Sequence, residues 1–400
     1  MHPTLTYPEA IVVGLFQGVT ELFPVSSLGH SVLIPALVGG SWKSDLDVTA
    51  AQSPYLAFIV GMHVATAIAM IIYFWRDWLR IVKGFFASFS QITSPAPGTG
   101  RFDLRDTNQK LAWMIILGTI PVGLAGVALD HTVRTVFAKP VPTAIFLAVN
   151  SLILFGGELM RRRRAGIDPQ QAAGDDHQMT PVRTAGYADP GGPYGRRAAA
   201  GNGGQIGNRD PYESADPYGG DPYRNGDPHR AGGQYGGGQY GGGGRHAARH
   251  ASGQRAVKQH EADVAVKSDQ RITKLSWLSA LALGASQILA LLPGISRDGS
   301  VMVSGLVRGL SRQDAARFSF LLSAPVIFAA GVFKGGELLG PETAGIRGPV
   351  LIGSIISGIG AYLALRFLDK YLSNPKRTLT PFAVYCLVMG VGSAIYLGIG

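Results

Sequence analysis

Long apolar runs separated by short polar segments fill two blocks of the chain, residues 1–160 and 275–400. Each block holds three runs whose lengths come close to the ~20 residues that an α-helix needs to cross ~30 Å of hydrocarbon. The six runs are Tyr55–Trp75, Leu111–Leu129, Val141–Met160, Phe318–Phe333, Pro349–Leu368 and Pro381–Ile399. This pattern predicts an all-α, polytopic membrane protein with three transmembrane helices in each block.

The beginning of each block is apolar but is broken by proline, glycine, serine and charged residues. Residues 8–40 include the sequence FQGVTELFPVSSLGH, and residues 275–310 include SQILALLPGISRDGS. Broken helices are tolerated at membrane depth where protein or a water-filled cavity covers their free backbone groups. We therefore expect each segment to form a re-entrant helix pair that enters and leaves the membrane on the same side.

The segment between the blocks, residues 161–274, differs sharply in composition. Gly, Arg, Asp, Tyr, Gln and Pro dominate it, in low-complexity repeats such as GGQYGGGQYGGGGR. Such a segment cannot bury a core, which predicts a disordered insertion. Its repeats could bind RNA or condense with partners, but a solvated insertion is favoured because a long loop adds little closure entropy. Deletion of Ala165–Val266 is expected to leave activity largely intact.

The basic residues are concentrated beside the apolar runs. Of the 36 Lys and Arg residues, six lie between Arg76 and Lys110, seventeen within residues 161–274, and four between Arg366 and Arg377. The net charge of +10 could suggest nucleic acid, but the positive-inside rule explains it more simply. The three regions, including residues 161–274, are predicted to be cytoplasmic, and no nucleic-acid partner is expected.

The N-terminal segment and the cysteine content exclude two further kinds of feature. The N-terminus has no basic segment before its first apolar stretch, which carries Glu9 and Glu21, so we expect no cleavable signal peptide. The single cysteine, Cys386, excludes an intrachain disulfide and a cysteine-based metal site.

The two broken segments resemble each other. Both contain Gly-x-x-Gln followed by Pro and by a small polar cluster: Gly14, Gln17, Pro24, Ser26, Ser27 and Gly29 in the first, and Gly284, Gln287, Pro293, Ser296, Arg297 and Gly299 in the second. The charge pattern gives the two sets of three spans opposite orientations. We therefore predict an inverted repeat, with the functional site near the bilayer midplane where the broken helices face each other.

The first segment carries candidate chemistry on its helix faces. Gln17 and Glu21 are four residues apart, so they lie on one helix face and suit a divalent cation that also binds phosphate oxygens. The alternative is a hydrogen-bonded pair that only secures a helix contact. A carboxylate within a membrane segment is costly, however, and is therefore a functional candidate.

After Pro24, the residues Ser26 and Ser27 stand at a helix start, where backbone N–H groups can receive an anion. Simple capping is the alternative. His30 follows Ser27 by one helical turn and could transfer a proton, or could be structural.

The second segment supplies a permanent cation. The Arg297 guanidinium suits a phosphate group, and Gly294 and Gly299 allow the backbone to approach an anion. The alternative is an Arg297–Asp298 ion pair that serves folding. His63, within the run Tyr55–Trp75, either supports this site or makes helix–helix hydrogen bonds.

These motifs resemble the undecaprenyl-diphosphate phosphatase family, the integral-membrane type linked to bacitracin resistance. The resemblance rests on Gln17-Gly-Val-Thr-Glu21, Pro24-Val-Ser-Ser-Leu-Gly-His30 and Pro293-Gly-Ile-Ser-Arg297, and it covers both apolar blocks but not the insertion. It implies a multi-pass inner-membrane hydrolase that converts the lipid undecaprenyl diphosphate to undecaprenyl phosphate and phosphate. The implied reaction recycles the cell-wall lipid carrier, uses a divalent cation (Mg²⁺ or Ca²⁺), and occurs in a site open to the outer side.

The resemblance also implies roles for individual residues. Gln17 and Glu21 would hold the metal, while Arg297, Ser296, Gly294, Ser26 and Ser27 would bind the diphosphate. Glu21 and Arg297 would also be catalytic. Either Ser27 or His30 would act as nucleophile or general acid/base, and the choice stays open. The chain departs from common family residues at Gln17, Asp298 and Cys386.

Two other classes of function compete with an enzyme. Inverted repeats with broken helices are also a transporter architecture, which would suit movement of a polyprenyl phosphate. Transport needs an anion site but no proton-transfer group, so Glu21, Ser27 and His30 favour the enzyme. A structural scaffold would leave Glu21 and Arg297 without a purpose. The motifs bear neither on oligomeric state nor on lipid chain length.

Overall fold

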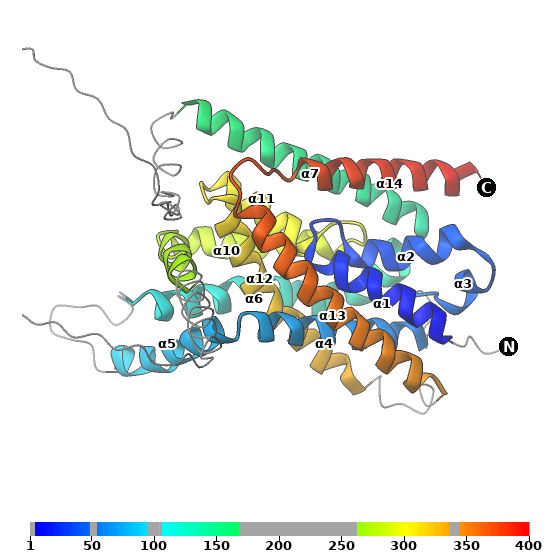
Figure 1. The fold of residues 1–400 in the computed structure, drawn as a ribbon, viewed down its shortest axis with the longest axis horizontal. Coiled ribbons are helices and arrows are strands. Elements are labelled where there is room, and N and C mark those ends of the chain that lie inside the picture. The colour runs from blue at the N-terminus through cyan, green and yellow to red at the C-terminus, as the bar shows by residue number, and fades with distance from the viewer. Residues whose placement is uncertain are drawn as a thin grey trace, which may run out of the picture. The chain divides into compact units, whose positions relative to one another are not determined.

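Every regular element in the described part of the chain is a helix, as the apolar runs predicted (Figure 1). The computed structural model describes residues 5–48, 54–93, 104, 106–167, 262–336 and 345–399. The first block contains α1 Tyr7–Leu22, α2 Ser27–Val38, α3 Gly40–Asp45, α4 Pro54–Tyr73, α5 Trp75–Thr93, α6 Thr107–Thr132, the π-helical η1 Val133–Phe137 and α7 Pro140–Ile167. The second block contains a helix at Ala262–Ile272, α10 Trp277–Ala285, the 3₁₀-helical η2 Ser286–Leu291, α11 Arg297–Val307, α12 Arg312–Lys334, α13 Arg347–Leu372 and α14 Thr380–Ile399.

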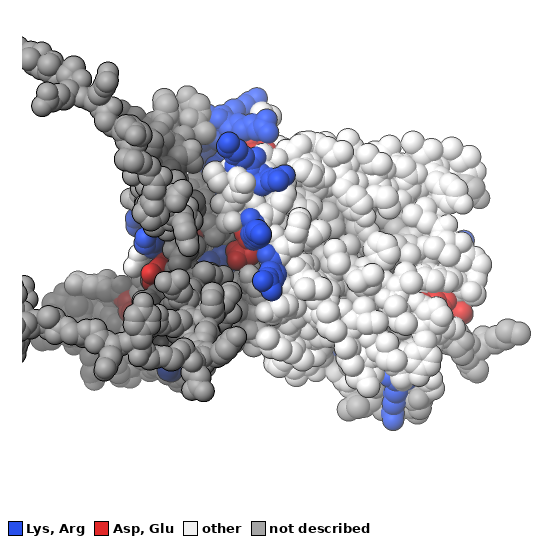
Figure 2. Space-filling view, in the orientation of Figure 1, with Lys and Arg blue, Asp and Glu red and all other residues white. Residues whose placement is uncertain are grey.

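Six of these helices are long and apolar enough to cross a membrane. They are Tyr55–Tyr73, Thr107–Leu129, Pro140–Arg164, Arg312–Lys334, Arg347–Leu372 and Thr380–Ile399. The prediction of six spans, three in each block, is thereby confirmed. In Figure 2 the blue Lys and Arg side chains gather at the end where α7 and α13 terminate, and the surface beyond them is nearly free of charge.

The first broken segment folds as a helix pair, α1 and α2 (Figure 1). Thr6 begins α1 with a capping box, in which its backbone N–H donates to Glu9 Oε2 at 2.9 Å. Proline at position 24 prevents α1 from continuing, and Ser26 begins α2 by accepting the Gly29 N–H at 3.2 Å. The break between the two helices therefore lies after Gln17 and Glu21 and before Ser26 and Ser27.

The second broken segment repeats this construction. Ser276 caps α10 by accepting the Ser279 N–H at 3.1 Å, and the chain continues through η2 until Pro293 ends it. Ser296 then caps α11 by accepting the Gly299 N–H at 3.1 Å. Both predicted helix pairs are present, although the second has a 3₁₀ turn where the first has regular α-helix.

Each helix pair packs against the middle span of the other block. On α1, a Cβ atom at Gly14 would lie 2.4 Å from the Gly353 carbonyl oxygen of α13, and one at Gly18 would lie 2.2 Å from the Ser357 carbonyl oxygen. On α10, a Cβ atom at Gly284 would lie 2.1 Å from the Gly118 carbonyl oxygen of α6. Small residues thus allow the backbones to approach closely, a common mode of helix packing in membranes.

The predicted insertion, residues 161–274, is too long at both ends. The helices α7, which runs to Ile167, and Ala262–Ile272 both extend into residues 161–274. The remaining residues of that range, 168–261, lie outside the described residues. Helix Ala262–Ile272 meets the segment Trp277–Leu291 at a bend of 102°. The apolar pattern did not predict this helix, because its sequence is largely polar and ion pairs to distant elements hold it in place.

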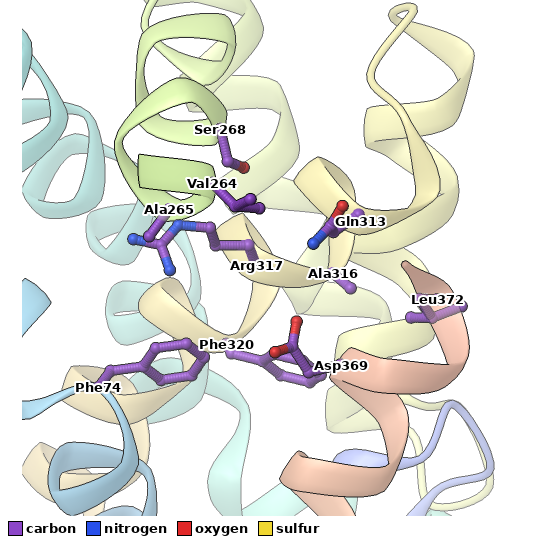
Figure 3. Close-up of a pocket in the computed structure, with 10 residues that line it drawn as sticks. All are labelled: Phe74, Val264, Ala265, Ser268, Gln313, Ala316, Arg317, Phe320, Asp369 and Leu372. Atoms are coloured by element: carbon purple, nitrogen blue, oxygen red, sulfur yellow. The ribbon is translucent and has the colours of Figure 1, made fainter. Parts of the chain in front are cut away.

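Those ion pairs connect helix Ala262–Ile272 to α12. Arg317 Nε donates to Asp269 Oδ1 at 2.8 Å, and Arg271 Nε donates to Asp314 Oδ2 at 2.7 Å. Between this helix, α12 and α13 lies a cavity of about 60 Å³ (Figure 3). Its lining residues are Phe74, Val264, Ala265, Ser268, Gln313, Ala316, Arg317, Phe320, Asp369 and Leu372.

Candidate active site

The turns of the two helix pairs meet, and they bring the two sequence motifs into contact. Arg297 Nη2, at the start of α11, donates to Glu21 Oε1, near the end of α1, at 2.5 Å. Ser26 Oγ accepts the Gly294 N–H at 3.1 Å. The structure therefore brings together residues more than 260 positions apart in the sequence, and the two motifs meet as the sequence predicted.

The Glu21 carboxylate is the centre of this site. Ser27 Oγ donates a short hydrogen bond to Glu21 Oε2, and Gln17 Nε2 donates to the same oxygen at 2.9 Å. His63 Nε2, from α4, lies 3.4 Å from it. Glu21 is buried, so its charge is balanced by these neighbours and by Arg297 rather than by bulk water.

Ser26 forms a strained turn that presents Ser27. Its φ of 67° and ψ of 97° make it the one non-glycine residue with positive φ in the described part of the chain. Such a conformation costs ~1–3 kcal/mol and persists only when its surroundings impose it. Here the Ser26 hydroxyl oxygen receives the N–H groups of both Gly29 and Gly294, which fixes Ser27 at the first position of α2.

Close contact between the turns requires glycine on both sides. A Cβ atom at Gly29 would lie 2.9 Å from Gly294 Cα. Gly294 has a φ of 110°, and a Cβ atom there would lie 2.4 Å from the Thr143 carbonyl oxygen. The Gly294 N–H donates to Ser26, so in this structure Gly294 joins the two turns.

Arg297 retains capacity to bind an anion. Its Nε is buried and has no hydrogen-bond partner among the described residues, while the side chain is 18% exposed. An unpaired buried donor costs ~1–3 kcal/mol, so an incoming oxyanion would be stabilised there. The alternative Arg297–Asp298 pair is not formed, because Asp298 instead accepts from Ser319 at 2.8 Å and Ser323 at 2.5 Å.

Ser296 lies at the same turn. Its hydroxyl caps α11, whose first backbone N–H groups, like those of α2, have no partner within the helix. Two helix N-termini therefore converge beside Arg297 and Ser27, and both favour negative charge.

His30 lies close to this site but is directed away from Glu21. Its Nδ1 is 2.7 Å from the Ser26 carbonyl oxygen, and its Nε2 is 2.7 Å from the hydroxyl of Tyr385 on α14. The His30 ring also stacks on the Tyr385 ring. Both ring nitrogens are thus engaged in holding the turn.

Asn150 of α7, which belongs to neither sequence motif and was not predicted, joins both turns. Its Nδ2 donates to the Pro24 carbonyl oxygen at 3.0 Å, and its Oδ1 accepts the Ser296 N–H at 3.0 Å. Asn150 is fully buried. An asparagine followed by serine within the apolar run Val141–Met160 was the signal that could have identified it.

The predicted metal ligands Gln17 and Glu21 are adjacent, as their spacing requires. No group of three His, Cys, Asp or Glu that could hold a metal occurs among the described residues. The Gln17 amide currently donates to Glu21, which matches the alternative interpretation of this pair. A rotated amide would place its oxygen beside the carboxylate, so the pair fits a divalent cation.

Several known proteins that are similar to this chain over nearly its whole length share one name. Undecaprenyl-diphosphatase of Mycobacterium avium (strain 104) is 45% identical over 399 residues, which cover 100% of both chains. Undecaprenyl-diphosphatase 1 of Frankia casuarinae is 44% identical over 403 residues and 99% of both chains. Undecaprenyl-diphosphatase of Acidiphilium cryptum is 30% identical over 394 residues and 98% of both chains.

The family described as bacitracin resistance protein BacA matches residues 10–187 and 252–392. Both turns of the candidate active site lie within the matched residues, and the gap lies within the predicted insertion. The resemblance inferred from the motifs is confirmed: this chain belongs to the bacitracin resistance protein BacA family.

Proposed function

We propose that this chain is a membrane phosphatase that hydrolyses undecaprenyl diphosphate to undecaprenyl phosphate and phosphate. The contact of Ser27 and Arg297 with the same buried carboxylate, Glu21, is the observation that carries this function. Full-length identity of 45% to a protein named undecaprenyl-diphosphatase supports the lipid substrate. Such an activity recycles the cell-wall lipid carrier and confers bacitracin resistance.

Ser27 is the proposed nucleophile. Its hydroxyl proton passes to Glu21 as Ser27 Oγ bonds to the terminal phosphorus, and the bond from that phosphorus to the bridging oxygen breaks. Undecaprenyl phosphate leaves with the bridging oxygen, which takes the proton from Glu21. Water then attacks the phosphoserine, with the ionised Glu21 as the general base. The proton that Glu21 accepts passes to Ser27 Oγ as inorganic phosphate leaves. The sharp turn at Ser26 supports this role, since strained turns also present the nucleophile in other hydrolases.

Arg297 and the N-terminal turns of α2 and α11 are the proposed diphosphate site. The unpaired Arg297 Nε supports binding of a phosphate oxygen. Ser26, Ser296 and Gly294 hold the two turns in position. His30 is assigned to supporting the Ser26 turn rather than to proton transfer, because Tyr385 and Ser26 occupy its ring nitrogens.

A divalent cation, Mg²⁺ or Ca²⁺ in the initial expectation, would be held by Gln17 and Glu21. When bound it would neutralise phosphate charge and polarise the phosphoryl oxygens. Arg297 alone offsets only the charge of Glu21 with which it pairs, so a second source of positive charge suits a diphosphate substrate.

The two blocks are proposed to form an inverted repeat in the inner membrane. The matching breaks at Pro24 and Pro293, and the packing of α1 on α13 and α10 on α6, support this symmetry. The basic end, with residues 161–274, is placed in the cytoplasm by the positive-inside rule. The α1–α2 pair begins at the opposite end (Figure 1), which is the outer side in this orientation, and we propose that the site opens there.

A transporter of polyprenyl phosphate shares this architecture. The hydrogen bond from Ser27 to Glu21 favours hydrolysis, because a proton acceptor beside a serine has no use in transport.

Phosphate release from undecaprenyl diphosphate by the purified protein, with and without a chelator, tests this function. Ser27→Ala and Glu21→Gln should each lower kcat by about 10²–10⁴-fold, because each removes a participant in proton transfer. Ser44→Ala, which alters an exposed serine of α3, is the matched control and should retain full activity. Wild-type rates in Ser27→Ala would exclude Ser27 as the nucleophile, and wild-type rates in Glu21→Gln would remove its catalytic assignment.

A further inference from the structure

His63 of α4 contacts the active-site carboxylate from a different element than either motif. Its Nε2 lies 3.4 Å from Glu21 Oε2 and 3.4 Å from Gln17 Nε2. The His63 side chain is 25% exposed, in contrast to the 3% of Glu21. The imidazole is therefore partly exposed, whereas the carboxylate that it contacts is buried.

The orientation of the His63 ring is fixed by its other nitrogen. Nδ1 lies 2.8 Å from the Ile59 carbonyl oxygen, which can only accept a hydrogen bond, so Nδ1 carries a proton. Nε2 is then the nitrogen that faces Glu21 and Gln17. A backbone carbonyl holding the second nitrogen is also the usual arrangement of metal-binding histidines.

Three atoms converge at this point with the spacing of metal ligands. The Gln17 amide atom lies 2.9 Å from Glu21 Oε2, and His63 Nε2 is 3.4 Å from both. Adjacent ligands of a six-coordinate cation with bonds of ~2.1 Å are ~3.0 Å apart. With the Gln17 oxygen in place of its nitrogen, a carboxylate, an amide and an imidazole would occupy one face of the cation.

We propose that His63 is the third protein ligand of the divalent cation, and that its imidazole shifts the preference of the site from Mg²⁺ and Ca²⁺ towards Mn²⁺ and other transition metals. Imidazole nitrogen favours transition metals, whereas Mg²⁺ and Ca²⁺ prefer sites made of oxygen ligands. This inference rests on the proposed function, because that function calls for a cation beside Glu21.

Pulsed electron paramagnetic resonance of Mn²⁺ added to the purified full-length protein tests this ligand directly. The wild type should show the nuclear modulation of a directly bound nitrogen. Growth with ¹⁵N-histidine should change that modulation without altering any residue. His63→Gln should lose the nitrogen signal, weaken Mn²⁺ binding by about 10–100-fold, and leave Mg²⁺ binding equal or stronger because an oxygen ligand replaces nitrogen.

His30→Gln is the matched control, because its ring nitrogens contact Ser26 and Tyr385 rather than Glu21. It should retain both the nitrogen signal and Mn²⁺ affinity. Persistence of the nitrogen signal in His63→Gln, or absence of a ¹⁵N-histidine effect in the wild type, would overturn the proposal. Phosphate release from the same preparations separates the two claims. Active wild-type protein without the nitrogen signal contradicts the metal ligand alone, and a nitrogen signal in an inactive protein contradicts the phosphatase alone.

Discussion

At the scale of single residues, the arrangement around Glu21 explains why a costly buried carboxylate is retained. Arg297 binds one of its oxygens, and Ser27 and Gln17 bind the other. Several directional partners hold a buried charge in one position. Loss of one partner leaves that charge without full compensation, which is costly. The carboxylate therefore organises the nucleophile and the anion-binding group at the same time.

Arg297→Lys tests whether the planar guanidinium matters beyond its charge. Lysine keeps the positive charge but cannot bind Glu21 and a phosphate oxygen through separate nitrogens of one rigid fork. We expect kcat/KM to fall by about 10–100-fold, which corresponds to ~1.5–3 kcal/mol for a hydrogen bond to a charged group. Steady-state kinetics measure this, and a rate within two-fold of wild type would show that charge alone suffices.

At the scale of elements, the site depends on two turns that are held together by a third helix. Asn150 of α7 is bonded to the Pro24 carbonyl of one turn and the Ser296 N–H of the other. Breaks in membrane helices free backbone groups that some neighbour must satisfy. Here the same side chain satisfies one such group on each turn and sets the distance between Glu21 and Arg297.

Asn150→Leu should therefore impair catalysis through position rather than through folding. Leucine has a similar size but leaves the Pro24 carbonyl and Ser296 N–H without their partner, so we expect kcat to fall by at least about ten-fold. Ser151→Ala is the matched control, because the Ser151 hydroxyl donates within its own helix, to the Ala148 carbonyl oxygen. Asn150→Asp keeps the acceptor for Ser296 and should recover part of kcat. Equal losses of kcat in all three variants would contradict a positioning role.

The packing of α1 on α13 makes a separate prediction about stability. A side chain at Gly18 would collide with the Ser357 carbonyl oxygen at 2.2 Å, and backbone cannot move aside cheaply. Gly18→Ala should destabilise the protein by about 1–3 kcal/mol. Gly123→Ala on α6, where nothing lies within 4 Å, should have little effect. Thermal unfolding in detergent compares the two, and equal midpoints would contradict the close packing.

At the scale of the whole molecule, helix Ala262–Ile272 belongs with the membrane helices and not with the insertion. Asp269 bonds Arg317 of α12 and Arg80 of α5, so this helix joins segments from both blocks. Val264 and Ala265 also line the cavity beside Phe320 of α12 and Leu372 of α13 (Figure 3). Removal of this helix would take away one of the two carboxylates that pair with the buried Arg317, and would leave Asp77 as the other.

Two deletions distinguish the insertion from the helix. Deletion of residues 168–261 should retain at least half of the phosphatase activity in membranes, since it removes no contact described above. Deletion of residues 168–272 should lower stability and activity strongly, because it also removes Asp269. Comparable activity of the two deletion proteins would contradict the role of the helix, and loss of activity in a well-inserted 168–261 deletion would give the insertion a function.

Sequence alone determined the features that depend on local patterns. Run length and apolar composition predicted the six spans, because crossing hydrocarbon requires a minimum helix length. Proline and serine placed the breaks in α1–α2 and α10–α11, because proline ends a helix and serine caps the next. The motif residues Glu21, Ser27 and Arg297 stood out because polar groups in apolar segments are costly.

Tertiary structure decided what those residues contact. His63 and Asn150 carried only weak signals, since a polar residue in a span can equally serve helix packing. In helix Ala262–Ile272, charged residues interrupt the few apolar positions and hid their pattern. The pairing of His30 with Tyr385 lies across 355 positions of sequence. Contacts of this kind depend on how helices pack and which backbone groups their breaks leave free, and these follow from the complete arrangement rather than from any local run of residues.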